Sequence, residues 1–252
     1  RTNLIGTVNI LECLKLTKKK IIAVMITSDK AYKNLEISRG YNENDILKGD
    51  DPYGASKSSA DIAISSYYKS YFSQDNTKVL ISTARAGNVI GGGDWSPNRI
   101  LPDCIKSWSK NKKVTIRNPK STRPWQHVLD ITYGYMLLAL KLKKNPELNG
   151  EAFNFGPDKN NLKVIDLLKK SKLFWPNVKW KVNKRKKFKE NNLLHLNSQK
   201  SKKFLQWKKL LNFNDSIKFT IEWYKYYLNN KSKISQFSLA QILEYQKILN
   251  KK

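Results

Sequence analysis

The sequence contains few of the residues that build disulfide frameworks and metal centres. Its 252 residues include two cysteines, Cys13 and Cys104, and two histidines, His127 and His195. The cysteines lie far apart in the chain, so we expect neither a structural disulfide nor a His/Cys metal site. This cysteine content is consistent with the reducing environment of the cytoplasm. No apolar run is long enough to span a bilayer, and no signal-peptide pattern is present. We therefore expect a cytoplasmic protein without a metal and without a membrane partner.

Arginine is also scarce, and most of the formal net charge of +28 comes from lysine. A basic chain can bind nucleic acid or an anionic surface. These lysines are spread along the whole chain, however, and arginine is the better residue for recognising phosphates and bases. The densest basic run, residues 183–189, is typical of a solvated loop. We expect no nucleic-acid partner, and a non-catalytic, lysine-rich binder of nucleic acid is kept as an alternative.

Hydrophobic residues make up 40% of the sequence, which is enough for a packed core. Hydrophobic periodicity and turn residues predict helices and strands in alternation. The predicted helices cover residues 2–17, 53–72, 100–110, 130–143 (with Asp130 as N-cap), 164–172, 199–204, 216–228 and 237–249. The predicted strands cover residues 21–26, 78–84, 114–117, 153–156 and 179–182, and residues 121–130 are expected to form a turn. Alternation of this kind predicts an α/β fold with a doubly wound parallel sheet.

Two polar groups stand where such a sheet would bind a ligand. Ser28 and Asp29 follow the first predicted strand directly, and ligands bind at the carboxyl ends of strands in open α/β sheets. Tyr53 and Lys57 are four residues apart on the next predicted helix, so they share one face. A nearby ammonium favours a phenolate, which would let Tyr53 act as a base. This spacing alone is a weak signal, since two surface residues produce it equally well.

Longer motifs carry a family resemblance. The runs 27–30 (TSDK), 51–57 (DPYGASK), 85–91 (RAGNVIG), 123–128 (RPWQHV) and 153–156 (FNFG) together resemble the extended short-chain dehydrogenase/reductase family of nucleotide-sugar enzymes. The runs 84–95, 101–105 and 116–119 resemble its CDP-glucose 4,6-dehydratase branch. The resemblance covers residues 1 to about 160 well and the remainder loosely.

The resemblance implies a Rossmann-like doubly wound parallel sheet with a smaller α/β substrate-binding domain. Residues 1–92 would be the C-terminal half of the NAD-binding domain, with 124–156 packing back on it, and 93–252 would mainly bind the nucleotide sugar. The family's Gly-rich dinucleotide fingerprint belongs upstream of Arg1, so the N-terminal part of the domain is expected to be missing. The 252-residue chain alone should then bind NAD poorly and lack activity.

The implied reaction uses NAD to convert CDP-glucose to CDP-4-keto-6-deoxyglucose. Hydride leaves C4, water is lost across C5 and C6, and the hydride returns to C6. The resemblance further implies a homodimer or higher homo-oligomer and a role in lipopolysaccharide O-antigen biosynthesis. A 4-epimerase, or a dehydratase with another nucleotide, is the closer alternative.

Residue roles follow from the same resemblance. Tyr53 would take the 4-hydroxyl proton, assisted by Lys57, which also suits the nicotinamide ribose, and Ser28 would hydrogen-bond that hydroxyl. Asp29 and Lys30 are candidates for the acid and base of the elimination. Many related dehydratases have Asp-Glu where this chain has Asp-Lys, which fits the CDP-glucose branch. The candidates for binding the diphosphate are Asn88, Arg99 and Arg123. We expect His127 to be a buried structural residue, and Trp95 and Trp125 to serve in packing.

Overall fold

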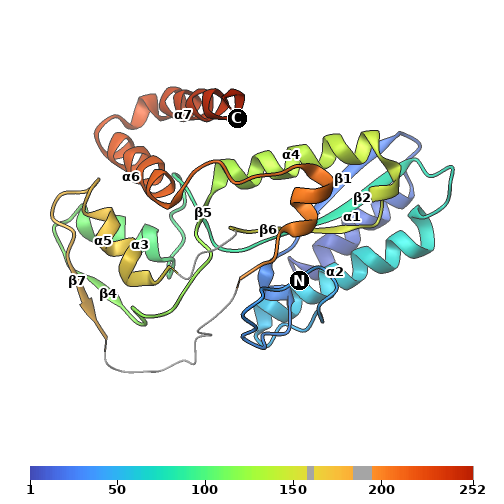
Figure 1. The fold of residues 1–252 in the computed structure, drawn as a ribbon, viewed down its shortest axis with the longest axis horizontal. Helices are drawn as coiled ribbons and strands as arrows, with labels where there is room; N and C mark the ends of the chain where they lie inside the picture. Colours follow the sequence, from blue (N-terminus) through green and yellow to red (C-terminus); the bar gives the residue numbers. More distant parts are fainter. Residues whose placement is uncertain (158–161, 184–194, 252) are drawn as a thin grey trace. The chain divides into compact units, whose positions relative to one another are not determined.

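The computed structural model describes residues 1–157, 162–183 and 195–251 (Figure 1). The helices and strands follow in the order α1 Leu4–Lys15, β1 Ile21–Ile26, α2 Pro52–Tyr67, β2 Val79–Ala86, β3 Val89–Ile90, α3 Ile100–Trp108, β4 Val114–Ile116, β5 Gln126–His127, α4 Val128–Lys144, β6 Ala152–Phe155, α5 Val164–Ser171, β7 Trp180–Val182, α6 Phe213–Asn229 and α7 Ile234–Asn250. The chain forms two compact units. Unit 1 comprises Arg1–Gly87, Ile131–Lys159 and Leu194–Lys208, and unit 2 comprises Asn88–Asp130, Asn160–Leu193 and Lys209–Lys252.

Unit 1 is built on a parallel sheet with the strand order β1–β2–β6. In register, Ile21 pairs with Val79, and Thr83 pairs with Ala152. The strands are rich in apolar and β-branched residues because the sheet is covered by other elements. Leu11 of α1 and Ile64 of α2 belong to one buried cluster with strand residues of β1 and β2. The predicted α/β fold with a parallel sheet is confirmed.

The ends of these elements show which residues reach the edge of the sheet. β1 coincides with the predicted strand, and α2 continues as one π-helical turn, Tyr68–Phe72. β2 extends beyond its predicted end because Arg85 and Ala86 pair with Asn154 and Phe155 of β6. Arg85 is therefore a strand residue whose side chain is held inside unit 1.

Unit 2 contains two small parallel pairings, β3 with β5 and β4 with β7. Its interior is one large apolar cluster to which α3, α5 and α6 contribute, among others, Ile105, Leu167 and Ile221. β5 lies inside the segment that the sequence predicted as a turn. With only two residues, this strand is too short to leave a periodic pattern. Residues 184–194, which include most of the basic run, lie outside the described residues.

The prediction that Asp130 caps the fourth major helix is wrong. α4 begins at Val128, so Asp130 lies in its first turn. The Asp130 Oδ1 atom accepts hydrogen bonds from the backbone N–H groups of Leu210 and Leu211 and from the Tyr245 hydroxyl, at 2.8, 3.4 and 2.9 Å. The Asp130 carboxylate therefore accepts hydrogen bonds from residues outside its own helix. Asp130 thus ties the last part of the chain to the start of α4 within unit 2.

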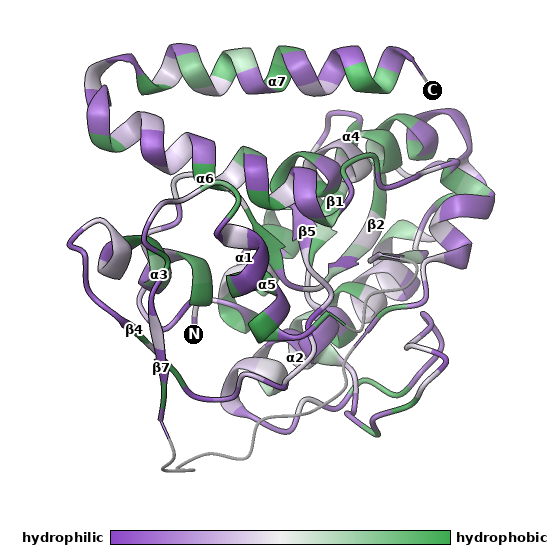
Figure 2. Ribbon diagram, turned by 60° about the vertical axis from the view of Figure 1, so that its left-hand side comes forward, coloured by the Kyte–Doolittle hydropathy of each residue, from purple (hydrophilic) through white to green (hydrophobic). Residues whose placement is uncertain are grey.

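The last two helices, α6 and α7, are amphipathic. Figure 2 shows hydrophobic and hydrophilic residues alternating along both. Tyr245 and Gln241 are buried on α7, whereas Leu239 and Leu243 stay about half exposed. On α6, Ile217, Ile221 and Tyr224 are fully buried at helical spacing, which is the apolar stripe of a helix that covers a core with one face. No helix in the described ranges is both long and apolar enough to cross a membrane.

Candidate active site

The turn after β1 holds Ser28 and Asp29 in the interior of unit 1, where their residues are 7% and 3% exposed. Ser28 caps a short 3-10 helix, Asp29–Ala31. Its Oγ accepts a hydrogen bond from the Lys30 N–H at 3.2 Å and donates one to Asp29 Oδ1 at 3.0 Å. Serine is a preferred N-cap because its oxygen satisfies a free N–H of the helix start. The hydroxyl is thereby fixed between backbone and carboxylate.

The start of α2 is defined by its own capping residues. Asp51 accepts a hydrogen bond from the Gly54 N–H at 2.8 Å, and Pro52 is the first helical residue. Both residue types favour a helix start at these positions. A Cβ atom on Gly54 would lie 2.8 Å from the carbonyl oxygen of Lys30. Glycine therefore lets the helix begin directly against the turn after β1.

Tyr53 and Lys57 lie on the first two turns of α2, as the sequence predicts. The Tyr53 residue is 50% exposed. The Lys57 Nζ atom donates a hydrogen bond to the carbonyl oxygen of Ile26, the last residue of β1, at 3.3 Å. Partial burial lowers the pKa of Lys57, because desolvation disfavours the charged ammonium. The ammonium is thus directed toward the carboxyl end of β1.

The structure brings these two segments together within unit 1. The Ser58 hydroxyl of α2 donates a hydrogen bond to the Ala31 carbonyl at 2.7 Å and accepts one from the Gly49 N–H at 2.8 Å. The turn with Ser28, Asp29 and Lys30 and the helix with Tyr53 and Lys57 are therefore neighbours. A hydroxyl, a carboxylate, an ammonium and a half-exposed phenol are the groups that general acid–base chemistry on an alcohol requires.

The predicted diphosphate ligands lie in unit 2. The Asn88 carbonyl accepts a hydrogen bond from the first residue of β5 at 3.2 Å. Arg99 precedes α3 directly, and its Nε atom lies 3.6 Å from Asp94 Oδ2 with 62% of the arginine side chain exposed. The Arg123 Nη1 atom donates to the carbonyl of Thr122 at 2.7 Å. Each of these residues keeps its predicted role as a prediction.

Of the residues expected to be structural, His127 and Trp125 are buried and Trp95 is partly buried. His127 is 2% exposed, and its Nδ1 atom accepts a hydrogen bond from the Leu129 N–H at 3.3 Å. Burial, aided by the positive charge of Lys209, lowers the pKa of His127 to about 3, so the ring is neutral at pH 7. Trp125 is also 2% exposed and belongs to the apolar cluster of unit 2. Trp95 packs against that cluster.

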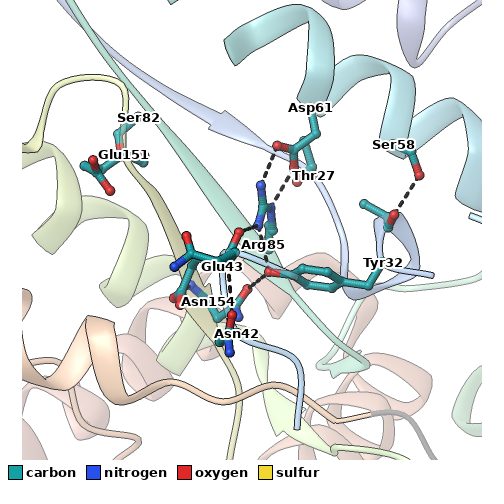
Figure 3. A network of polar contacts seen from close by, with 12 residues as sticks. Thr27, Tyr32, Asn42, Glu43, Ser58, Asp61, Ser82, Arg85, Glu151 and Asn154 are labelled. Carbon is teal, nitrogen blue, oxygen red and sulfur yellow. Dashed lines mark hydrogen bonds and ion pairs between the residues drawn. The ribbon is translucent and has the colours of Figure 1, made fainter. Parts of the chain in front are cut away.

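A buried polar network was missed at the level of sequence (Figure 3). Arg85 forms a bidentate ion pair with Asp61 of α2, with Nε–Oδ2 and Nη2–Oδ1 distances of 2.8 and 2.7 Å. The Arg85 Nη1 atom also donates to the Tyr32 hydroxyl at 2.7 Å and to the Glu43 carbonyl at 3.0 Å. Asp61 is eight residues after Tyr53, which was the one available signal that it shares the face of the predicted catalytic pair.

Comparisons with known proteins identify the family of the chain. Residues 1–220 match the protein family described as GDP-mannose 4,6 dehydratase. A CDP-glucose 4,6-dehydratase of Salmonella typhimurium is 35% identical over 235 residues, which cover 91% of this chain and 66% of the relative. A dTDP-D-glucose 4,6-dehydratase of Dictyostelium discoideum is 31% identical over 179 residues, or 67% of this chain and 38% of the relative. The chain thus spans about two thirds of the first relative's length and less of the second's.

Solved structures show the same fold. A dTDP-glucose 4,6-dehydratase from Bacillus anthracis in complex with NAD superposes with a TM-score of 0.75, at 23% identity, over 91% of this chain and 69% of that one. A UDP-glucuronic acid 4-epimerase from Bacillus cereus in complex with UDP-glucuronic acid and NAD also gives 0.75, at 22% identity, over 88% of this chain and 67% of that one. The family match over most of the sequence, together with this fold and the Tyr53–Lys57 helix, shows that the chain belongs to the GDP-mannose 4,6-dehydratase family of the extended short-chain dehydrogenases/reductases.

Proposed function

We propose that the protein is a hydro-lyase that dehydrates CDP-glucose to CDP-4-keto-6-deoxyglucose with NAD. The proposal is carried by the pairing of the Ser28–Lys30 turn with the Tyr53–Lys57 helix in a chain that is 35% identical to a CDP-glucose 4,6-dehydratase. Unit 1 would carry the redox and acid–base groups, and unit 2 the nucleotide contacts. A cytoplasmic location and a role in lipopolysaccharide O-antigen biosynthesis belong to the same proposal.

The donor groups of unit 1 suit NAD. Lys57 offers an ammonium one helical turn from Tyr53, whose residue is 50% exposed, and the ammonium and phenol donors match the hydroxyl groups of a nicotinamide ribose. When bound, NAD supplies the acceptor for the C4 hydride and returns that hydride to C6.

The first chemical step would be removal of the 4-hydroxyl proton by Tyr53. Lys57 lies one helical turn from Tyr53, and partial burial lowers the pKa of Lys57, so Lys57 would assist this proton transfer. Ser28 would donate to the same sugar oxygen as negative charge develops on it. The Ser28 hydroxyl donates to Asp29 in the structure. On substrate binding it would donate to the sugar oxygen in place of Asp29.

Elimination needs a base for the C5 proton and an acid for the C6 hydroxyl that leaves as water. Asp29 and Lys30 would supply these two groups. Asp29 is buried and Lys30 is half-buried, so both lie at the edge of the interior rather than in bulk solvent. Asn88, Arg99 and Arg123 of unit 2 would bind the nucleotide diphosphate, since amide and guanidinium donors match its oxygens.

The test is turnover of glucose linked to CDP, dTDP, GDP or UDP. The complete protein and the 252-residue chain are each incubated with NAD and one nucleotide sugar, and the product mass and the alkaline absorbance of the 4-keto sugar are measured. We expect the complete protein to convert CDP-glucose fastest, to a product lighter by one water molecule. Equal or faster turnover of another sugar by the complete protein would reassign the nucleotide, and no turnover of any of the four sugars by the complete protein would refute the proposal.

A 4-epimerase is the second candidate, because a UDP-glucuronic acid 4-epimerase shares the fold. Epimerisation leaves the product mass unchanged and needs no acid–base pair for elimination. Conversion of a nucleotide sugar to an isomer of equal mass would therefore favour this candidate. An Asp29→Asn variant separates the two further, since dehydration should fall steeply while epimerisation should persist.

We also infer that the protein assembles as a homodimer or higher homo-oligomer. Large apolar side chains are exposed on α1 and α2 of unit 1, namely Ile5, Ile10 and Ile62, at 51, 53 and 54%. α1 and α2 pack against each other, and contiguous exposed apolar patches mark protein–protein interfaces. Light scattering should give at least twice the monomer mass, and Ile62→Lys should lower it, whereas a monomeric wild-type protein would contradict the inference.

A further inference from the structure

Arg85 lies at the centre of a buried hydrogen-bond network in unit 1 and is 4% exposed (Figure 3). Its guanidinium reaches three separate segments: Asp61 on α2, Tyr32 after the 3-10 turn, and the backbone of Glu43. A guanidinium holds its donors in a rigid planar fork, so each bond restricts the direction of the others. Arg85 therefore fixes the mutual orientation of these segments.

The first segment is the helix that carries the predicted catalytic pair. Tyr53, Lys57 and Asp61 follow one another at intervals of four residues, so they lie along one face of α2. Asp61 is about 12 Å further along the axis than Tyr53. Because both carboxylate oxygens of Asp61 are bound by Arg85, α2 cannot turn about its axis without breaking this ion pair.

The second segment is the turn that carries Ser28, Asp29 and Lys30. On its N-terminal side, the Thr27 hydroxyl donates to Asp61 Oδ2 at 2.7 Å. On its C-terminal side, the Tyr32 hydroxyl accepts from Arg85 and donates to the Asn154 side-chain oxygen at 2.8 Å. Both ends of the turn are thus tied to the ion pair that holds the helix.

Stability alone gives little reason for this ion pair. Buried pairs pay a desolvation cost that their attraction often only matches, and well-packed apolar replacements are frequently as stable. Satisfied polar networks do specify one arrangement of the groups that they join. A more exposed ion pair of the same unit, Arg39 with Asp45, has its other side-chain hydrogen bonds to the backbone of Gly40 and Asn42 and so offers a matched comparison.

We propose that Asp61, Arg85 and Thr27 are positioning residues, which hold the Ser28–Lys30 turn and the Tyr53–Lys57 helix in the register that the reaction needs. This assignment rests on the proposed function. None of the three touches the substrate in this scheme. Each acts through the residues that do.

The mildest test changes one hydroxyl. Thr27→Val removes the bond to Asp61 and keeps the side-chain shape, whereas Thr27→Ser keeps the bond. In the complete protein with CDP-glucose and NAD, we expect Thr27→Val to lower kcat about tenfold with KM within about twofold, and Thr27→Ser to restore most of it. Displacements of about 1 Å can cost up to about a hundredfold in rate. A wild-type kcat in Thr27→Val would overturn the role of Thr27.

The stronger test replaces the ion pair by apolar residues of similar volume, Asp61→Leu with Arg85→Met. We expect this double variant to fold, by circular dichroism, with kcat lowered about a hundredfold and the acid limb of the kcat–pH profile displaced. The control Arg39→Gln should match the wild type in both. A folded double variant with wild-type kcat and pH profile would refute the proposal. If the double variant does not fold, the Thr27 pair decides.

A measurement without turnover keeps this proposal separate from the proposed function. The protein is treated, without NAD or nucleotide sugar, with an amine-acylating reagent, and labelling of Lys57 is followed by peptide mass spectrometry. If the network holds the helix, Thr27→Val should raise the labelling rate of Lys57 about threefold or more, through local opening, while Thr27→Ser and Arg39→Gln should not. An unchanged rate refutes the positioning role even if the protein is a dehydratase, and a raised rate supports it even if CDP-glucose is not turned over.

Discussion

Unit 1 buries an ion pair at the carboxyl end of its sheet, whereas the largest buried cluster of unit 2 consists of apolar and aromatic side chains. The side chains of Arg85 and Asp61 are 5% and 3% exposed and bind neighbouring segments through directional hydrogen bonds. In unit 2, the fully buried Ile105 and the 1% exposed Trp108 belong to a cluster whose contacts are mainly those of packing.

The two interiors differ in whether they fix the orientation of elements or mainly stabilise the fold. Hydrogen bonds of a guanidinium fork depend on angle, so they fix how elements are oriented. The hydrophobic effect is non-directional and scales with buried area, so it stabilises a fold without specifying orientation as sharply. Damage to the ion pair of unit 1 should therefore change reactivity as well as stability. Damage to the cluster of unit 2 should mainly change stability.

The largest effect is expected at the reactive end of unit 1. Tyr53→Phe removes the phenolic oxygen and leaves the ring, so the fold should persist. Loss of a general base costs about 10²- to 10⁴-fold in rate. Steady-state kinetics of the complete protein with CDP-glucose should show this in kcat with little change in KM. Retention of more than about a tenth of the wild-type kcat would contradict the assigned role.

The next effect is on the stability of unit 1. Asp61→Asn leaves the Arg85 guanidinium buried without its carboxylate, and removal of one partner of a buried pair typically costs about 3–5 kcal/mol. Urea unfolding followed by circular dichroism and by hydrogen exchange in α2 and β2 would measure the loss. Arg39→Gln, in the exposed pair, should cost about 0–1 kcal/mol. Equal losses in the two variants would remove the contrast between a directional and a solvated ion pair.

A substitution that creates a cavity in the apolar cluster of unit 2 is the counterpart of the ion-pair variants of unit 1. Ile105→Ala should lower the free energy of unfolding by about 2–5 kcal/mol, because methyl groups are lost from a packed cluster. Ile105→Val should cost about 0.5–1.5 kcal/mol. At a urea concentration where both variants are folded, kcat should stay near that of the wild type. A kcat loss as large as that of the ion-pair variants would show that the cluster also fixes orientation.

The smallest effect is a pH dependence of unit 2. The pKa of His127 falls from 6.5 to about 3 on folding, first because of burial. Between these values the unfolded chain binds a proton that the folded chain does not. This stabilising contribution is therefore complete above about pH 6.5 and is lost as the pH falls toward 3, by about 1.4 kcal/mol per pH unit. At pH 5 the loss should be about 2 kcal/mol.

His127→Gln is the control for that pH dependence, since it removes the titrating ring and leaves the other ionisable groups. Unfolding free energies of the two proteins, measured from pH 7.5 to 4.5, give a difference curve that isolates His127. The curve should slope in the direction just derived. A flat curve would mean that the ring is protonated as easily in the folded as in the unfolded state.

Local patterns in the sequence were sufficient to predict much of unit 1. The continuous apolar run at residues 21–26 coincides with β1, and the capped start of α2 places Tyr53 and Lys57 on one helix. These features depend on neighbours within a few residues. The parallel direction of the strands followed from the alternation of helices and strands, because strands joined by crossover helices run parallel.

Partners distant in sequence explain what could not be predicted. Asp130 has the residue type of an N-cap, but it is bound by Tyr245, which is 115 positions away. Arg85 was visible only as part of a motif, since Asp61 and Tyr32 become its partners through the packing of α2 on the sheet. Side-chain direction within a fold is set by tertiary contacts, and single-sequence patterns do not record these.

The tryptophans are distributed unevenly between the two units, which affects the intrinsic fluorescence of the protein. Trp207 lies in unit 1, and every other tryptophan of the sequence lies in unit 2. Trp108 and Trp175 have ring centroids 6.3 Å apart, and Trp223 stacks on Tyr227 at 5.4 Å. Indole emission will therefore follow the state of unit 2 almost alone. A Trp207→Phe chain would turn the intrinsic fluorescence of the protein into a reporter for one of its two units without any attached dye.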